Sequence, residues 1–177
     1  MQCQEGEIMA KVLNYGMVGG GPDAFIGDAH RRAISLDESA RLVAGVFSRN
    51  AEKSKKMGEV LHIEEERCYK DYETMALEEA KREDGIDFVV VVTPNASHYE
   101  ICKAFLNAGI HVVCDKPVTT TYEKAVELQK LAEEKSLLFM VTYTYMGHVT
   151  AKYARDLIAS GAIGDVRAVM AEYPQGD

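Results

Sequence analysis

The stretch YGMVGGGPDAFIGDAHRR, residues 15–32, joins an apolar run to an amphipathic segment through three consecutive glycines. Residues 11–19 are almost continuously apolar, which predicts a strand buried on both faces. Residues 24–36 carry the spacing of an amphipathic helix. A glycine-rich turn between a first strand and a first helix is typical of the βα unit that opens a doubly wound α/β fold.

The rest of the chain continues this alternation of strands and helices. The clearest strand is 86–93, because its four consecutive valines need burial on both faces, as in the centre of a parallel sheet. Helix-length segments between strands imply crossover connections and therefore a parallel sheet of the Rossmann type. We predict further strands at 40–48, 67–69, 110–115, 137–145 and 165–174, and helices at 50–61 (with Asn50 as N-cap), 71–83, 97–109, 121–136 and 148–164.

The glycines at the first turn suit a phosphate-binding loop. Gly19 permits the tight turn, and Gly21 lets the backbone approach a pyrophosphate, whose space a β-carbon would occupy. A third glycine allows the helix to pack closely, with its N-terminal N–H groups aimed at the phosphates. Strict G-x-G-x-x-G spacing puts Ala24 in that third position, whereas Gly27 fills it if the loop is longer. A glycine-rich turn without a ligand is the alternative.

The end of the second strand bears on which dinucleotide binds. NAD-binding domains place an Asp or Glu there for the ribose 2′-OH, whereas an arginine accommodates the 2′-phosphate of NADP. Here Ser48 and Arg49 follow the strand, and no acidic residue occurs between Arg41 and Ala51. The sequence favours NADP over NAD, unless Arg49 is only a solvated residue at the start of a helix.

Composition limits the other function classes. The 177 residues are 47% hydrophobic, enough for a substantial core, and their formal net charge of −8 argues against binding nucleic acid or an anionic membrane. The four cysteines form no Cys-x-x-Cys pair, which suits reduced thiols better than disulfides or a zinc site, so we expect no metal. The first residues lack the pattern of a signal peptide, and a cytoplasmic location is expected.

Two further motifs carry a family resemblance: VVTPNASHYE at 91–100 and AGIHVVCDKPVTTT at 108–121. With the glycine loop, they resemble the Gfo/Idh/MocA family of nicotinamide-dependent oxidoreductases, which includes glucose-fructose oxidoreductase and inositol 2-dehydrogenase. The resemblance covers residues 11–175. The spacing of Gly27 and His30 also matches the family and supports Gly27 as the third glycine.

The resemblance implies roles for particular residues. Lys116 matches the family's catalytic lysine, which hydrogen-bonds the substrate hydroxyl beside the carbon that exchanges the hydride and assists proton removal. Asp115 replaces the family's usual Glu, and Pro117 is expected to follow a cis peptide bond. His98 is a metal ligand or base in principle, but its place in a first helical turn favours a structural role. The residues expected at the cofactor are Gly19, Gly20, Gly21, Ala24, Phe25, Ile26, Gly27, Ser48, Arg49, Thr93, Pro94, Asn95, His98, Asp115, Lys116 and Pro117.

The family pattern also predicts the organisation of the chain. We expect an N-terminal tail at 1–10, an NAD(P)-binding Rossmann domain at 11–145, and a connecting helix and first strand of an otherwise absent substrate domain at 146–177. The resemblance implies a polyol or sugar substrate and a homo-oligomer formed through that second domain. Two functions follow: an oxidoreductase that moves a hydride between NAD(P) and a sugar or cyclitol hydroxyl or ketone, or a catalytically silent nucleotide-binding module. A catalytic lysine at position 116 favours the first.

Overall fold

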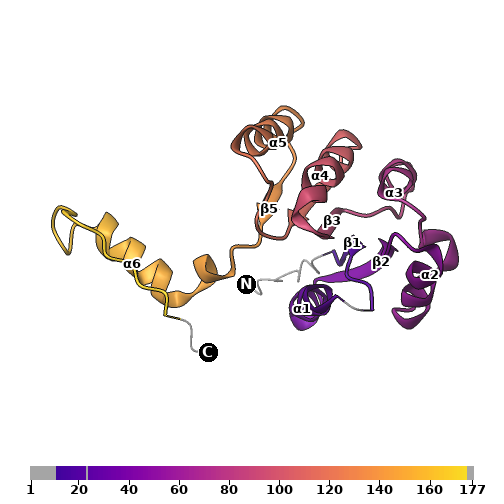
Figure 1. Ribbon diagram of the computed structural model, residues 1–177, viewed down its shortest axis with the longest axis horizontal. Helices are drawn as coiled ribbons and strands as arrows, with labels where there is room; N and C mark the ends of the chain where they lie inside the picture. The colour runs from indigo at the N-terminus through magenta and orange to yellow at the C-terminus, as the bar shows by residue number, and fades with distance from the viewer. Residues whose placement is uncertain (1–10, 23, 175–177) are drawn as a thin grey trace, which may run out of the picture. The chain divides into compact units, whose positions relative to one another are not determined.

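A computed structural model describes residues 11–22 and 24–174; the predicted tail at 1–10 lies outside these residues. Five parallel strands form one sheet in the order β2-β1-β3-β4-β5, flanked by helices (Figure 1). This confirms the predicted doubly wound α/β fold. The strands are β1 (Leu13–Gly19), β2 (Ala40–Val46), β3 (Phe88–Val92), β4 (His111–Cys114) and β5 (Phe139–Val141).

The valine run forms the centre of the sheet, as predicted. Strand β3 pairs with β1 on one side, where Val90 lies opposite Met17, and with β4 on the other, where Val91 lies opposite Cys114. Val89 and Val90 are also fully buried. Because consecutive side chains point to opposite faces, these valines supply the core on both sides of the sheet.

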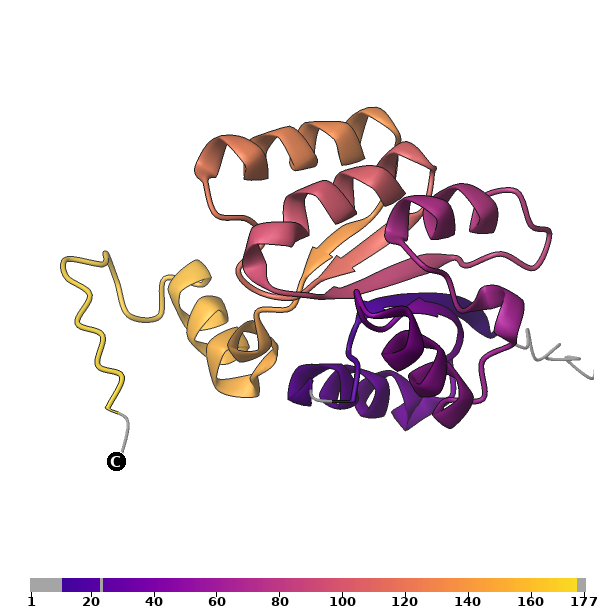
Figure 2. The same ribbon diagram turned by 45° about the vertical axis from the view of Figure 1, so that its right-hand side comes forward.

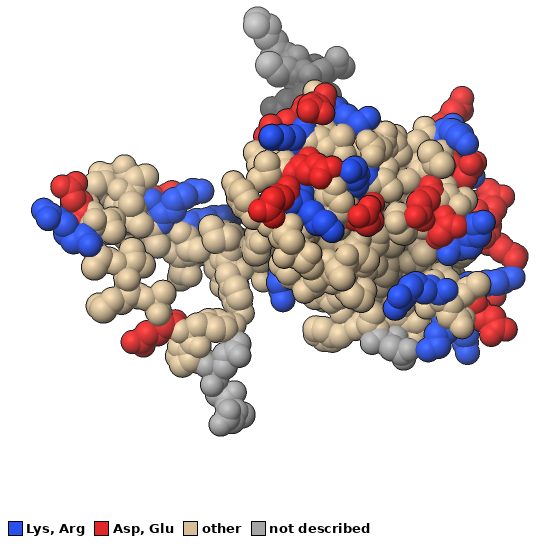
Figure 3. Space-filling model, turned by 45° about the horizontal axis from the view of Figure 1, so that its top comes forward, with Lys and Arg blue, Asp and Glu red and all other residues tan. Residues whose placement is uncertain are grey.

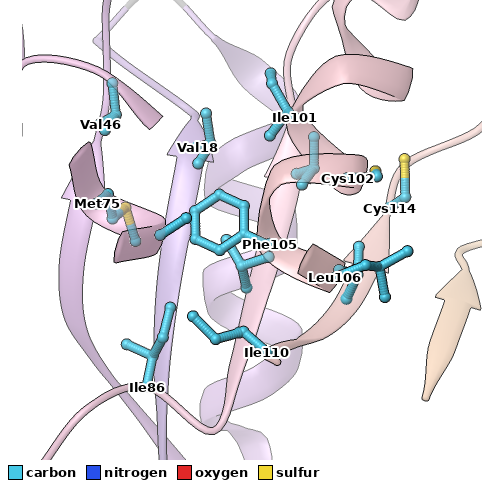
Figure 4. Packing of buried hydrophobic residues seen from close by; sticks show 14 of the residues in the cluster. Val18, Val46, Met75, Ile86, Ile101, Cys102, Phe105, Leu106, Ile110 and Cys114 are labelled. Carbon is cyan, nitrogen blue, oxygen red and sulfur yellow. The ribbon is translucent and has the colours of Figure 1, made fainter. Parts of the chain in front are cut away.

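Helices cover both faces of this sheet (Figure 2). The helices are α1 (Phe25–Ile34), α2 (Ala51–Val60), α3 (Tyr72–Glu79), α4 (His98–Asn107) and α5 (Tyr122–Glu134). Val89 and Val91 belong to a core with residues of α3, α4 and α5. Figure 4 shows part of this core, including Met75 of α3 and Phe105 of α4. Val90 and Val92 belong to a second core on the face of α1 and α2. On the face seen in Figure 3, basic and acidic side chains are interspersed over this part of the molecule.

Side-chain caps fix where several helices begin. The Asn50 side chain accepts a 3.0 Å hydrogen bond from the backbone of Lys53, which confirms it as the N-cap of α2. Asp71 caps α3 in the same way, with 2.7 Å to the Thr74 nitrogen. Helix α1 differs, because its N-cap is Ala24, which has no side-chain acceptor.

The predicted strand at 67–69 is wrong. Residues Glu65–Arg67 form a 3₁₀ turn, and only Cys68 makes an isolated parallel bridge, to Gly45. The reason is that Arg67 turns inward and is almost fully buried in an ion pair with Glu79 of α3. The backbone nitrogens of Arg67 and Cys68 also donate to Glu64 and Glu65 within this turn, so they do not form the hydrogen bonds of a strand.

The chain divides into a unit that ends at Thr142 and a unit that begins at Tyr143. The second contains a 3₁₀ turn (Thr144–Gly147) and helix α6 (Val149–Ala159). The hydroxyls of Tyr145 and Tyr173 lie 2.8 Å apart within it. Residues 165–174, predicted as a strand, have no regular structure. A strand needs a hydrogen-bonding neighbour, and none of the described residues pairs with this segment.

Candidate functional site

The loop after β1 adopts a backbone that only glycine adopts easily. Gly19 has φ of +95° and Gly20 has φ of +70°, in the left-handed region that other residues rarely adopt. A β-carbon on Gly19 would also lie 2.6 Å from the carbonyl oxygen of Val92, at the end of β3. The loop therefore turns tightly against the neighbouring strand, as its predicted role requires.

Helix α1 packs directly on this loop through Gly27. A β-carbon at Gly27 would lie 2.4 Å from the α-carbon of Gly20, so the helix and the loop touch backbone to backbone. Ala24 has a different place: it precedes the helix, and its nitrogen donates to the Gly21 carbonyl at 2.9 Å. Gly27 is thus the residue that allows close packing, while Ala24 faces the cleft described below.

Gly21 is needed by the fold itself. A β-carbon there would lie 2.6 Å from the carbonyl oxygen of Phe47, just beyond β2. The expectation that a side chain at position 21 would meet only a bound pyrophosphate is therefore incomplete. Any larger residue must first displace the backbone that follows β2.

These elements border a cleft of about 480 Å³ at the carboxyl ends of β1, β2 and β3. In open α/β sheets this edge is where ligands bind. Eight of the sequence-predicted residues line the cleft: Gly19, Gly20, Gly21, Ala24, Ser48, Arg49, Thr93 and Pro94. The other eight do not line it: Phe25, Ile26, Gly27, Asn95, His98, Asp115, Lys116 and Pro117.

The cleft also contains residues that sequence reasoning missed. Lys53 comes from the first turn of α2, and Lys70, Asp71 and Tyr72 come from the start of α3. The Cys68–Gly45 bridge brings the segment before α3 beside β2, which explains their place in the cleft. A sequence signal existed, because a parallel segment at 67–69 puts residues 70–72 at the same edge as the end of β2.

The rim at the end of β2 is rich in cations. Arg49, Lys53 and Lys70 line it, and Asp71 is the carboxylate among the lining residues. The hydrogen bonds from Thr74 lower the pKa of Asp71, whose Oδ1 caps α3 while its Oδ2 lies 3.8 Å from Lys70 Nζ. This part of the cleft suits an anionic group better than a ribose hydroxyl alone.

The loops after β3 and β4 form a second cluster of predicted residues. Asn95 is exposed and opens a 3₁₀ turn, and the Ser97 hydroxyl donates to Thr93 Oγ1 at 2.9 Å. Lys116 is exposed, and the predicted cis peptide bond between Lys116 and Pro117 is confirmed. Thr93 thus belongs both to the cleft and to this cluster.

Asp115 points toward the interior of the unit. Its Oδ1 accepts a 2.9 Å hydrogen bond from the Thr142 hydroxyl and lies 3.8 Å from His30 Nε2. Burial lowers the pKa of His30, and the neighbouring Asp115 carboxylate opposes that shift. The acidic residue before Lys116 therefore anchors the loop to β5 and α1.

His98 lies beneath both loops and is 1% exposed. Its Nδ1 is 2.8 Å from the Pro117 carbonyl oxygen and its Nε2 is 2.7 Å from that of Thr93. The ring therefore contacts main chain on both sides. This geometry matches the structural role that the sequence favoured.

Three further observations concern metal ligands, thiols and membrane-length helices. Among residues 11–22 and 24–174, no three His, Cys, Asp or Glu side chains are grouped to hold a metal ion. Cys68, Cys102 and Cys114 are free thiols. No helix in the described part of the chain is long and apolar enough to cross a membrane.

Comparisons with known proteins agree with this architecture. The family described as "Oxidoreductase family, NAD-binding Rossmann fold" matches residues 13–143. The uncharacterized oxidoreductase YfiI of Bacillus subtilis is 45% identical over 170 residues, which are 96% of this chain and 43% of that protein.

Solved structures are similar as well. An inositol dehydrogenase homologue from Azotobacter vinelandii, complexed with NAD⁺, is 42% identical with a TM-score of 0.85, covering 89% of this chain and 41% of that one. An oxidoreductase from Pseudomonas syringae is 44% identical with a TM-score of 0.83, covering 89% and 43%. The chain spans about two fifths of the length of these three proteins. By its glycine loop, its sheet and these matches, the chain belongs to the Gfo/Idh/MocA family of oxidoreductases with an NAD-binding Rossmann fold.

Proposed function

We propose that this chain is the cofactor-binding part of an oxidoreductase that transfers a hydride between NAD(P) and a hydroxyl or ketone of a sugar or cyclitol. The observation that carries the proposal is the cleft bordered by the glycine loop and the ends of β2 and β3. Support for a cyclitol comes from the Azotobacter homologue, which has also been solved as a complex with NADH and myo-inositol. When bound, a nicotinamide cofactor supplies the carbon that gains or loses the hydride.

The glycine loop and α1 fit a pyrophosphate. The N-cap Ala24 itself offers no side-chain acceptor to the first N–H groups of the helix, which belong to residues including Phe25, Ile26 and Gly27. Phosphate oxygens can accept such hydrogen bonds, and the positive end of the helix favours their charge. Gly27 keeps this helix end against Gly20, which holds the donors at the edge of the loop.

The cationic rim supports NADP(H) as a cofactor bound at least as well as NAD(H). Ser48 and Arg49 stand where an acidic residue would accept from a ribose 2′-OH. Lys70 lines the same rim, 3.8 Å from Asp71 Oδ2, so a 2′-phosphate would meet Arg49 and a second cation there. NAD(H) is the alternative, because the similar Azotobacter structures are complexes with NAD⁺ and NADH.

Lys116 is the residue we propose to act on the substrate. It is exposed at the end of β4, next to the loop that carries Thr93 and Pro94. The ammonium form of Lys116 can donate a hydrogen bond to a substrate oxygen, and its neutral amine form can accept the proton of a substrate hydroxyl. This exchange is general acid–base catalysis. Asp115, held by Thr142, keeps the backbone of this loop in place.

We also propose that residues 11–145 form the cofactor domain, that 146–177 lead into a substrate domain, and that this domain supplies a homo-oligomer interface. The proposal is supported by the relatives' length, of which this chain spans about two fifths. Unit boundaries at Thr142 and Tyr143 fall close to the proposed division.

A titration of the chain with NADPH and NADH tests cofactor binding. Fluorescence of the reduced nicotinamide should change on binding, and an excess of the oxidised cofactor should reverse the change. The variant Lys130→Met is a suitable control, because Lys130 is an exposed residue of α5 that does not line the cleft. A chain that binds neither nucleotide would refute the proposal.

A further inference from the structure

His98 occupies the point where the loops after β3 and β4 come together. It is the first residue of α4, yet its ring is buried instead of solvated. One ring nitrogen contacts the carbonyl of Thr93, which follows β3, and the other contacts the carbonyl of Pro117, which follows β4. A single side chain therefore links the loop that lines the cleft to the loop that carries Lys116.

The hydrogen-bonding partners of the ring determine how many of its two nitrogens carry a proton. A carbonyl oxygen can only accept a hydrogen bond, and a neutral imidazole has only one N–H donor. In the neutral form, one nitrogen lone pair would face a carbonyl oxygen at 2.7 or 2.8 Å, which is repulsive. Both contacts are hydrogen bonds only when both nitrogens carry a proton.

A buried imidazolium needs compensation for its lost hydration, and the N-terminus of α4 adds an unfavourable positive potential. The two carbonyl oxygens supply part of that compensation, and Cys114 of β4 supplies another part. Burial lowers the pKa of His98, but the contacts with Cys114, Pro117 and Thr93 outweigh it and raise the pKa to about 9.

The other titratable groups around this ring act through Cys114. A hydrogen bond with Cys102 of α4 lowers the pKa of the Cys114 thiol, burial opposes that effect, and the contact with His98 lowers the pKa further. Asp115 raises the pKa of the same thiol through its charge. Cys114 therefore favours the positive charge of the ring through its deprotonated form, and Asp115 opposes that deprotonation.

We infer that His98 is a positioning residue: as a doubly protonated ring, it ties the Thr93 and Pro117 carbonyls together and so fixes the Lys116 loop against the cofactor cleft. The expected effect on cofactor binding rests on the proposed function, whereas the protonation state of the ring is independent of it. Loss of one ring proton would break one of these two hydrogen bonds. The position of the Lys116 loop relative to Thr93 in the cleft would then no longer be fixed.

Nuclear magnetic resonance of the wild-type chain tests the protonation state without any cofactor. Histidine labelled with ¹⁵N, assigned with His98→Asn, should show both ring nitrogens of His98 protonated at pH 7. One proton should be lost with a midpoint near pH 9. A ring nitrogen of His98 that is unprotonated at pH 7 would overturn the inference.

Cofactor affinity tests the positioning role. In the wild type, the affinity for NADPH and NADH should fall by about tenfold as pH rises through 9, which is about 1.4 kcal/mol and the size of one hydrogen bond to a charged group. His98→Asn should bind about tenfold more weakly at pH 7 and lack this step. His62→Asn is the matched control, because His62 is exposed, and its φ of +57° suits asparagine.

The outcomes separate the two proposals. If His98→Asn keeps the wild-type affinity and pH profile, His98 is not a positioning residue, even if its ring is doubly protonated. If the wild type binds neither nucleotide, the proposed function fails, and the ring protonation at pH 7 still decides whether the imidazolium exists. Should His98→Asn not fold, the wild-type resonances and pH profile carry the test.

Discussion

At the scale of single residues, Gly27 makes the most direct prediction. Its α-carbon packs on the loop so closely that an added β-carbon would lie 2.4 Å from Gly20. We expect Gly27→Ala to lower the free energy of unfolding by about 1–3 kcal/mol, the usual cost of overpacking. The same change should weaken nucleotide binding, because α1 must move away from the glycine loop.

Urea unfolding and an NADPH titration measure these two effects. Gly147→Ala is the control, because nothing lies within 4 Å of a β-carbon at that position and its φ is not positive. Unchanged stability of Gly27→Ala would mean that the helix and loop do not touch as described.

Arg49 carries a prediction about cofactor choice. Arg49→Ala should weaken NADPH binding by about tenfold or more, the loss of a charge-assisted hydrogen bond worth about 1.5–3 kcal/mol, and leave NADH nearly unchanged. Lys56→Ala removes a cation from α2 that does not line the cleft, and it should affect neither nucleotide. An equal loss for both nucleotides, or none, would make Arg49 a surface residue without a role in cofactor choice.

Among the elements, the turn before α3 depends on a buried ion pair. Arg67 Nε donates to Glu79 Oε1 at 3.0 Å, and both side chains are almost completely buried. Arg67→Leu should lower the free energy of unfolding by about 3–5 kcal/mol, because it leaves the Glu79 carboxylate buried without its cationic partner, although the Tyr69 hydroxyl still donates to it at 2.8 Å. The double variant Arg67→Leu, Glu79→Leu should recover a large part of that loss. A double variant no more stable than the single one would exclude this explanation.

The same turn shows where sequence reasoning about elements fails. Two local signals were interpreted correctly: the valines predicted strand β3, and Asn50 was predicted as the N-cap of α2. Residues 67–69 carried a strand pattern, but Arg67 finds its partner twelve residues further along, which no local pattern reveals. Strand β5 is also shorter than its predicted range of 137–145, because Thr142 turns to Asp115 and a 3₁₀ turn follows.

The site was predictable to a similar extent. The left-handed backbone at Gly19 and Gly20 follows from the glycine pattern, and the position of the loop after β2 follows from the strand order. Lys53 was missed because its place in the cleft depends on how α2 packs beside β2, whereas the predicted extended segment at 67–69 already pointed to the place of Lys70. The double contact of His98 was not readable from sequence, since it joins Thr93, five residues before it, to Pro117, nineteen residues after it, and only the packing of the sheet brings these two carbonyls together.

At the scale of the whole molecule, we expect the 177-residue chain to bind cofactor without turning over a substrate. Hydride transfer needs the reacting carbon held about 3–3.5 Å from its partner, and the proposed substrate domain would provide that alignment. The chain extended through this domain should oxidise polyols or sugars, and Lys116→Met in the extended protein should lower kcat by about 10²–10⁴-fold.

Absorbance of the reduced nicotinamide measures turnover, and extended Lys130→Met is the control that should stay active. Turnover by the 177-residue chain alone would contradict the proposed division of the protein. An extended Lys116→Met enzyme with unimpaired kcat would remove Lys116 from the mechanism.

The central claim is that a nicotinamide dinucleotide binds in the cleft at the carboxyl ends of β1, β2 and β3. The most direct measurement is a titration of the ¹⁵N-labelled chain with NADPH, followed through its backbone amide resonances. The shifts should be largest at Gly20, Gly21, the first turn of α1 and Arg49, with smaller shifts at Thr93 and none at the far end of the sheet near Asp84. Binding without shifts at the glycine loop, or shifts centred on another surface, would contradict the claim.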